Sequence, residues 1–146
     1  LLKENDIPVI LGEVHSLPAG DDEKIDLPYR TAAMLQQAGI LYSLSISGFW
    51  QVRNLPFMAG TTVAYGVSKE DALKSITSNT AKILGIDSRT GTLETGKDAN
   101  IIISTGDLLD MKSSNIERAF IQGRDISLDN AQKQLNETYK QKYNIK

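Results

Sequence analysis

The segment from Asn79 to Ile103 constrains the fold more than any other part of this 146-residue chain. Its first part, Asn79-Thr80-Ala81-Lys82-Ile83-Leu84-Gly85, is typical of the end of an amphipathic helix with a glycine stop. After a five-residue spacer, Gly91-Thr92-Leu93-Glu94-Thr95-Gly96-Lys97-Asp98-Ala99-Asn100 predicts a tight turn, and Ile101-Ile102-Ile103 predicts a buried strand. A helix that leads through a glycine-bounded turn into a buried strand indicates a protein of mixed helix and sheet.

Apolar and amphipathic segments alternate through the first two thirds of the chain. Short apolar runs at 8–14 and 40–46 predict buried strands. Amphipathic patterns with caps and glycine stops predict three helices, over 26–38, 54–65 and 68–84. The order strand, helix, strand, helix, helix is typical of βαβ units and a parallel sheet.

The last third changes character. Two further strands are predicted at 98–104 and 116–121, and Gln122-Gly123-Arg124 predicts a tight turn that leads toward Ile126. A final helix is predicted to begin at Asp129 with Gln132, and we expect it to dock through an apolar stripe at four-residue spacing. The stripe is Ala131, Leu135, Tyr139 and Tyr143, and Lys133, Lys140, Lys142 and Lys146 occupy the rest of the helix.

Composition excludes several classes of protein. The chain is 40% hydrophobic, which suffices for one core, and it contains no cysteine, so it has neither disulfides nor thiolate metal sites. A net charge of −2 argues against a nucleic-acid partner, and no apolar run approaches the roughly 20 residues that cross a bilayer. Residues 1–6 resemble the last turn of a helix whose beginning is absent, so we expect this chain to be a piece of a longer protein.

The segment from Leu27 to Lys69 contains no acidic residue, and its only charged side chains are Arg30, Arg53 and Lys69. An ordinary segment is about a quarter charged. Burial alone would explain the pattern. The segment could also line a pocket, or a surface covered by a further part of the protein, and both interpretations can hold together.

Three segments resemble one family. They are Trp50-Gln51-Val52-Arg53-Asn54-Leu55-Pro56-Phe57-Met58-Ala59-Gly60, residues 68–85 and the turn at 91–100. They resemble the imidazolonepropionase- and prolidase-like branch of the metal-dependent amidohydrolases, and the likeness covers residues 8–126. It implies an α/β fold in which residues 1–86 form the last βα units of a (β/α)₈ barrel. Residues 87–128 would then supply strands of the associated small β-sandwich, and 129–146 a C-terminal amphipathic helix.

The resemblance also implies a function. The parent protein would be a hydrolase of C–N bonds in non-peptide amides, imides or dipeptides, with a divalent metal such as zinc in its site. The family holds metal with a His-x-His pair on the first strand, further histidines on middle strands and an Asp that ends the last strand. This chain has a single histidine. Its position matching the Asp is Gly48, or alternatively Ser47, and neither supplies a carboxylate. We therefore expect no catalytic residue and no bound metal in this chain alone.

Other residues are candidates for contact with a small-molecule substrate. His15 follows the first predicted strand, and Arg53 and Trp50 follow the second. Arginine can bind a carboxylate or phosphate with two parallel hydrogen bonds, although a structural role in the loop is equally compatible with the sequence. Glu13 and His15 are two residues apart and would face the same side of a strand, but two ligands do not make a zinc site.

Three functions from different classes stay open. The chain can be the C-terminal part of a working amidohydrolase, a non-catalytic amidohydrolase-like domain that binds ligands or assembles with other domains, or a stand-alone α/β interaction module. On the first two, its partner is the N-terminal part of the same protein, and apolar surface exposed toward that part would promote association, including a homo-oligomer. The sequence predicts no membrane or nucleic-acid partner, and it does not indicate a compartment.

Overall fold

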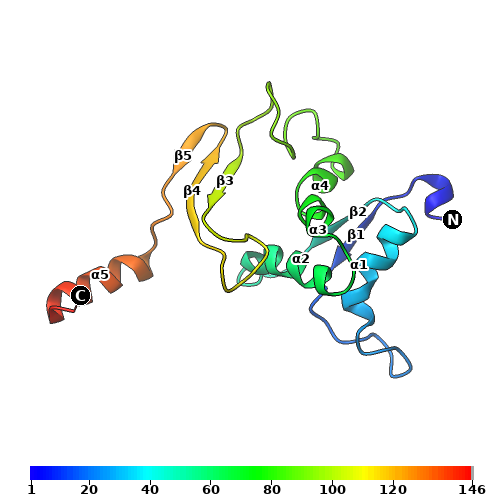
Figure 1. Cartoon of the computed structure of the whole chain (residues 1–146), viewed down its shortest axis with the longest axis horizontal. Coiled ribbons are helices and arrows are strands. Elements are labelled where there is room, and N and C mark those ends of the chain that lie inside the picture. Colours follow the sequence, from blue (N-terminus) through cyan, green and yellow to red (C-terminus); the bar gives the residue numbers. More distant parts are fainter. Residues whose placement is uncertain (146) are drawn as a thin grey trace.

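The computed structural model describes residues 1–145 and has two small sheets, one packed among the helices and the other set to one side of them (Figure 1). The first sheet is parallel, with strands β1 (Val9–Gly12) and β2 (Tyr42–Ser45). The second is antiparallel, with strands β3 (Ile101–Ser104), β4 (Ile116–Ile121) and β5 (Arg124–Ile126). The helices are η1 (Lys3–Asn5), α1 (Leu27–Gln37), η2 (Val52–Asn54), α2 (Leu55–Ala64), α3 (Lys69–Ser75), α4 (Ser78–Ile83) and α5 (Ala131–Tyr143). Within residues 1–145 the parallel strands do not close into a barrel.

The parallel pair has the register Val9↔Tyr42 to Gly12↔Ser45. Side chains alternate along β1, so Val9 and Leu11 pack against the core while Ile10 is 56% exposed on the opposite face. The two strands are joined by α1, as expected of a parallel crossover. The sequence therefore predicted this unit correctly.

Helices α1 to α4 pack on β2 and bury mostly small side chains. Most of the buried core lies inside the acid-free segment 27–69, including Ala32, Ala33, Leu44, Met58 and Ala59. Small residues let the helices approach closely, and Met58 fills the space between them without any exposed surface. Burial thus accounts for the absence of acids over much of this segment.

The start of α3 is fixed by the predicted capping residues. Ser68 Oγ accepts a hydrogen bond from the Asp71 amide at 3.1 Å and donates one to Asp71 Oδ2 at 2.6 Å. The same Oδ2 accepts from Gln36 Nε2 at 2.7 Å, so one carboxylate links the start of α3 to α1. Lys74 also approaches Asp71, at 3.4 Å from Oδ1.

The helix predicted over 68–84 is wrong in one respect, because it is broken into α3 and α4. The break falls at Thr77, whose φ of −131° and ψ of −94° are not helical. Two hydroxyl groups near the break donate hydrogen bonds to backbone carbonyls. Ser75 Oγ donates to Ala72 O at 2.6 Å, and Thr77 Oγ1 donates to Leu73 O at 2.8 Å. Such side-chain bonds compete with the helical ladder, and the apolar stripe gave no sign of them.

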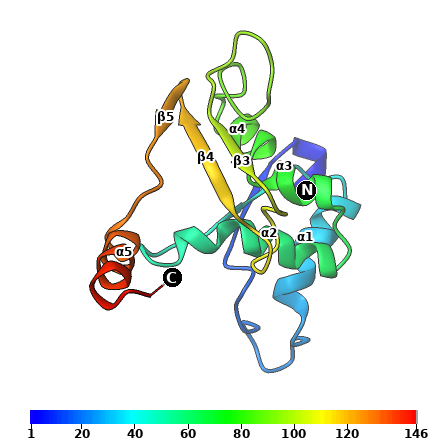
Figure 2. The same cartoon turned by 60° about the vertical axis from the view of Figure 1, so that its left-hand side comes forward.

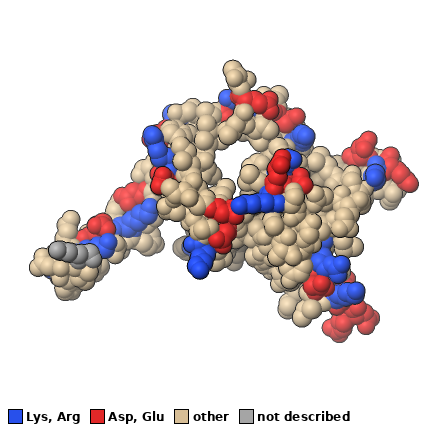
Figure 3. Space-filling model, in the orientation of Figure 1, with Lys and Arg blue, Asp and Glu red and all other residues tan. Residues whose placement is uncertain are grey.

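The second sheet joins the helices at one close contact. The loop after β3 carries Leu109, which is buried against Gly60 of α2. An ion pair from Lys69 Nζ to Asp107 Oδ2, 2.7 Å long, holds the same loop to the start of α3. Beside this junction a cavity of about 540 Å³ separates β3 from α3 and α4, and the molecular surface is visibly hollowed between the two parts (Figure 3).

The final helix does not dock as expected within the described chain. Helix α5 extends away from the body in both views (Figures 1 and 2), and its stripe residues Leu135, Tyr139 and Tyr143 are each more than half exposed. Its cap is Asn130, whose side chain accepts from the Lys133 amide, rather than Asp129. Lys146, predicted to belong to the basic face of this helix, lies outside the described residues. Among the described residues, no helix has the length and apolar character needed to cross a bilayer.

We predict that Gly60→Ala weakens the fold although alanine is the better helix former. In an exposed helix the change would stabilise by roughly 0.5–1 kcal/mol. Here the new Cβ would lie 2.0 Å from Leu109 O. The loop must therefore move, and we expect the free energy of unfolding to fall by about 1–3 kcal/mol. Urea denaturation measures this, with Gly20→Ala as control because nothing lies within 4 Å of that site. A free energy of unfolding of Gly60→Ala equal to or greater than that of the unmodified protein would contradict the close contact between Gly60 and Leu109.

A second prediction concerns pH. The hydrogen bond from Ser68, with those from Lys74 and Gln36, lowers the pKa of Asp71 below its ordinary 3.8. A lowered pKa in the folded state means that the ionised carboxylate stabilises the fold above pH 3.8, and that this contribution is lost as the pH falls through the lowered pKa. Ser68→Ala removes both the cap and the main cause of the shift. It should cost about 1 kcal/mol at pH 7 and less at pH 2.

Unfolding free energies at the two pH values provide the measurement, and Ser88→Ala is the control because this exposed serine forms no side-chain hydrogen bond within residues 1–145. An equal loss of stability at both pH values would show that Asp71 is not coupled to the cap.

Candidate functional site

Polar and aromatic side chains follow the carboxyl ends of both parallel strands. Glu13 comes directly after β1, and the loop from Ile46 to Gln51 comes directly after β2. Because the strands are parallel, their carboxyl ends lie at one edge of the sheet. Ligand sites in parallel α/β proteins are built at this edge.

Glu13 and Ser47 meet at that edge. Ser47 Oγ donates a hydrogen bond of 2.6 Å to Glu13 Oε1, and the Glu13 amide donates one of 3.2 Å to Ser45 O. The backbone of Glu13 is left-handed, with φ at +48°, so the alternation of side chains between the two faces of β1 ends before Glu13. Consequently Glu13 and His15 do not share a direction as the sequence predicted. One contacts Ser47 and the other contacts Thr61.

A side chain at Gly48 would be strained in this conformation. Its φ is +98°, a backbone region that other residues rarely adopt, and an added Cβ would lie 2.4 Å from Oε1 of Gln51. A carboxylate at this position would therefore strain the backbone, whereas the contact can be relieved by rotation of the flexible Gln51 side chain. Ser47 next to it has no such restriction, and its hydroxyl is already committed to Glu13.

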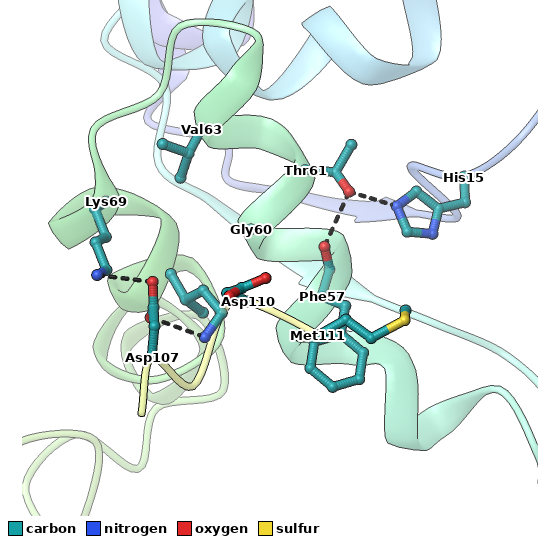
Figure 4. A pocket seen from close by; sticks show the side chains of 10 residues that line it. His15, Phe57, Gly60, Thr61, Val63, Lys69, Asp107, Asp110 and Met111 are labelled. Atoms are coloured by element: carbon teal, nitrogen blue, oxygen red, sulfur yellow. Dashed lines mark hydrogen bonds and ion pairs between the residues drawn. The ribbon is translucent and has the colours of Figure 1, made fainter. Parts of the chain in front are cut away.

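His15 is held by α2. Its Nε2 lies 2.7 Å from Thr61 Oγ1, and its ring centroid lies 6.3 Å from that of Tyr29 on α1. The Thr61 hydroxyl has one proton, which it donates to Phe57 O at 2.9 Å (Figure 4). It therefore accepts from His15, which makes the neutral ring the Nε2–H tautomer and leaves Nδ1 as a free acceptor.

A pocket of about 350 Å³ lies between His15 and the loop after β3 (Figure 4). Its polar lining combines His15 and Thr61 with the Lys69–Asp107 ion pair. The Lys69 ammonium, and then the Leu109 amide, lower the pKa of Asp107, so this carboxylate is ionised at neutral pH. Phe57, Val63, Leu109 and Met111 supply apolar walls. The pocket can therefore take a small molecule with both polar and apolar parts.

Trp50, on the loop after β2, and Arg53, in the following helix η2, lie together. The Arg53 guanidinium carbon is 5.8 Å from the centroid of Trp50, and Phe49 meets Trp50 edge-on at 5.3 Å. Both aromatic rings are mostly exposed, 84% for Phe49 and 66% for Trp50. Within residues 1–145 Arg53 forms no ion pair, so its planar donor edge is free for an anionic group.

The predicted substrate contacts therefore fall into two groups. Arg53 and Trp50 contact each other, whereas His15 lies on the side of α2 with Thr61, and no hydrogen bond joins the groups in the described chain. Their roles as substrate contacts stay predictions. Sequence reasoning missed Thr61, Lys69 and Asp107, which come from α2, from the start of α3 and from the loop after β3. No local pattern indicates that such residues meet.

A metal ion would need ligands from elsewhere. Nowhere in residues 1–145 do three or more His, Cys, Asp or Glu side chains gather closely enough to hold one. Structural and catalytic zinc sites use at least three protein ligands. Glu13 and His15 have separate partners and do not fit this requirement by themselves.

The chain is similar to solved amidohydrolase structures. One is an amidohydrolase from Thermotoga maritima MSB8, which is 36% identical, with a TM-score of 0.72 over 86% of this chain and 33% of that one. Another amidohydrolase is 18% identical, with a TM-score of 0.57 over 80% of this chain and 31% of its own, and shows a likeness of fold alone. The chain thus spans about a third of the length of these structures. No curated protein sequence matches it.

The sequence profile of the Amidohydrolase family extends over residues 30–126, from the first turn of α1 to the end of β5. This match covers well over half of the chain and includes the loop after β2, the α2–α4 helices and the whole antiparallel sheet. Together with the structural likeness, it shows that the chain belongs to the amidohydrolase family.

Proposed function

We propose that this chain is the C-terminal part of a hydrolase that acts on C–N bonds, in non-peptide amides, imides or dipeptides. On this proposal β1 and β2 are the last two strands of a (β/α)₈ barrel, and β3 to β5 belong to its small β-sandwich. The parallel pairing of β1 and β2 across α1 and the match to about a third of longer amidohydrolases support this arrangement. The resemblance of residues 50–60, 68–85 and 91–100 to the imidazolonepropionase- and prolidase-like branch supports the substrate class.

One observation carries the proposal. The polar groups Glu13, Ser47 and Arg53 all follow the carboxyl ends of parallel strands, the edge where barrel enzymes of this kind place their sites. The remaining residues of a catalytic site, including metal ligands, would come from the other strands of the barrel. This chain would then contribute substrate contacts through His15, Arg53 and Trp50.

A second candidate function is a non-catalytic amidohydrolase-like domain that binds ligands or assists assembly. The observation that favours it is Gly48, whose backbone, with φ at +98°, would be strained by any side chain and so disfavours a carboxylate here. The exposed apolar residues Ile10, Ile102 and Leu93 are compatible with assembly against further parts of the protein or a second copy.

Metal content and activity of the whole protein, purified without added metal or chelator, separate the two functions. We expect about one or two equivalents of zinc or another divalent ion per chain, the load of a catalytic site of this class. We also expect hydrolysis of at least one member of a panel of cyclic imides, N-acyl amides and dipeptides. A protein that binds no metal, even after reconstitution, and hydrolyses no substrate of the panel would favour the non-catalytic domain.

Arg53→Lys tests the proposed substrate contact. Lysine keeps the charge but loses the planar fork that binds a carboxylate with two hydrogen bonds, so KM for a carboxylate-bearing substrate should rise about tenfold with kcat little changed. Arg118→Lys is a matched control, because Arg118 also lies over an aromatic ring, 5.0 Å from the centroid of Phe120, but on the antiparallel sheet. If KM rises equally in both variants, or does not rise in either, Arg53 does not contact the substrate.

A further inference from the structure

We propose that Glu13 is the residue that takes the proton from the attacking water in the C–N hydrolysis. This inference rests on the proposed function and assigns a catalytic role that the sequence did not predict. It starts from the placement of one carboxylate at the carboxyl ends of two paired strands.

The Glu13 carboxylate is held over the end of the neighbouring strand. The Glu13 amide donates to Ser45 O, the last residue of β2, and Glu13 Oε1 accepts from Ser47 Oγ at 2.6 Å. Within residues 1–145 the second oxygen, Oε2, forms no hydrogen bond or ion pair. The side chain is exposed at this edge, so a water molecule can reach Oε2.

The backbone of Glu13 adds an independent argument. A residue other than glycine or asparagine with φ near +48° costs roughly 1–2 kcal/mol. The other such residues, Asp6, Gln122 and Asn144, lie at helix ends or in a hairpin turn, where this conformation is ordinary. Glu13 instead follows a parallel strand, and the next residue, Val14, is buried in the core. Glycine would be less costly here, and a strained residue at a strand end is a candidate for a functional role.

Glu13 is the carboxylate that lies directly at the end of β1, and the acids Asp21, Asp22, Glu23 and Asp26 come later in the loop that follows. Glu13 is the sole acidic residue within 7–20, and the segment 27–69 has none. The alternative base is His15, whose free Nδ1 is a proton acceptor. His15, however, is bound to Thr61 on α2 and lines the pocket beside Met111, whereas Ser47 at the strand ends contacts Glu13.

The step is chemically complete with these groups. As the water oxygen attacks the carbonyl carbon of the substrate, Glu13 Oε2 accepts one of its protons while the Ser47 hydroxyl keeps Oε1 in place. When the C–N bond breaks, the proton passes from Glu13 to the leaving nitrogen. The products are a carboxylic acid and an amine or amide, and the Glu13 carboxylate is regenerated.

The test uses the whole protein and compares kcat of Glu13→Gln with that of the unmodified enzyme. Glutamine keeps the size of the side chain, and its amide oxygen still accepts from Ser47, but it does not take up a proton at neutral pH. We expect kcat to fall by about 10²–10⁴ with KM within a few fold and an unchanged Tm. Glu117→Gln on β4 is the matched control and should leave kcat unchanged.

Glu13→Ala supplies a second readout that a structural role would not move. Added formate should restore part of the lost kcat in this variant, because a small carboxylate can occupy the space of the missing one, and it should not affect the unmodified enzyme. If Glu13→Ala does not fold, Glu13→Gln with an unchanged Tm still decides the question.

The outcomes separate the two proposals. A whole protein that hydrolyses no substrate of the panel overturns the proposed function and this inference with it. An active protein in which Glu13→Gln retains kcat within threefold overturns only the role of Glu13. A large loss of kcat in both variants without rescue of Glu13→Ala by formate also overturns it.

Discussion

The parallel pairing of β1 with β2 is the constraint on which the rest of this structure depends. Four residues of each strand pair in register, from Val9↔Tyr42 to Gly12↔Ser45. The pairing fixes α1 as the crossover and gives α2, α3 and α4 one surface to pack on. It also places Glu13 and Ser47 within hydrogen-bonding distance, since both follow the same end of the sheet. The architecture and the proposed site therefore have one origin.

The second sheet depends on a different kind of contact. It is joined to the helices by the approach of Leu109 to Gly60, with the Lys69–Asp107 ion pair beside it. The ion pair is partly exposed and by itself stabilises the fold little. Its value is geometric, since it holds the loop that completes the pocket next to His15. A glycine in a helix is normally a weakness, and here it is what allows a loop backbone to lie against α2.

The fold could be predicted from the sequence where local signals agree with tertiary packing. The strands predicted at 8–14, 40–46, 98–104 and 116–121 and the cap at Ser68 are present, because their apolar runs and turn residues are local. The third antiparallel strand, β5, was predicted only as the segment after a tight turn. The break at Thr77 was not predicted, because the apolar stripe continues through it while side-chain hydroxyl groups hydrogen-bond to the backbone carbonyls. Helix α5 was predicted, but its docking was not observed, since an amphipathic pattern does not say what covers it.

The site shows a sharper limit of sequence reasoning. The sequence led to the expectation of no catalytic residue in this chain, because Gly48 and Ser47 carry no carboxylate and the segment 27–69 around them contains no acid. That reasoning followed one strand along the chain. In the structure the nearest carboxylate comes from the neighbouring strand, across a gap of 34 residues in sequence, and it reaches Ser47 because the backbone of Glu13 turns out of the strand. In a parallel sheet, a site at the carboxyl ends of the strands can contain side chains from every strand that ends there. On the proposed function, a carboxylate missing from one strand end is supplied from the next, and the left-handed backbone of Glu13 directs its side chain to Ser47.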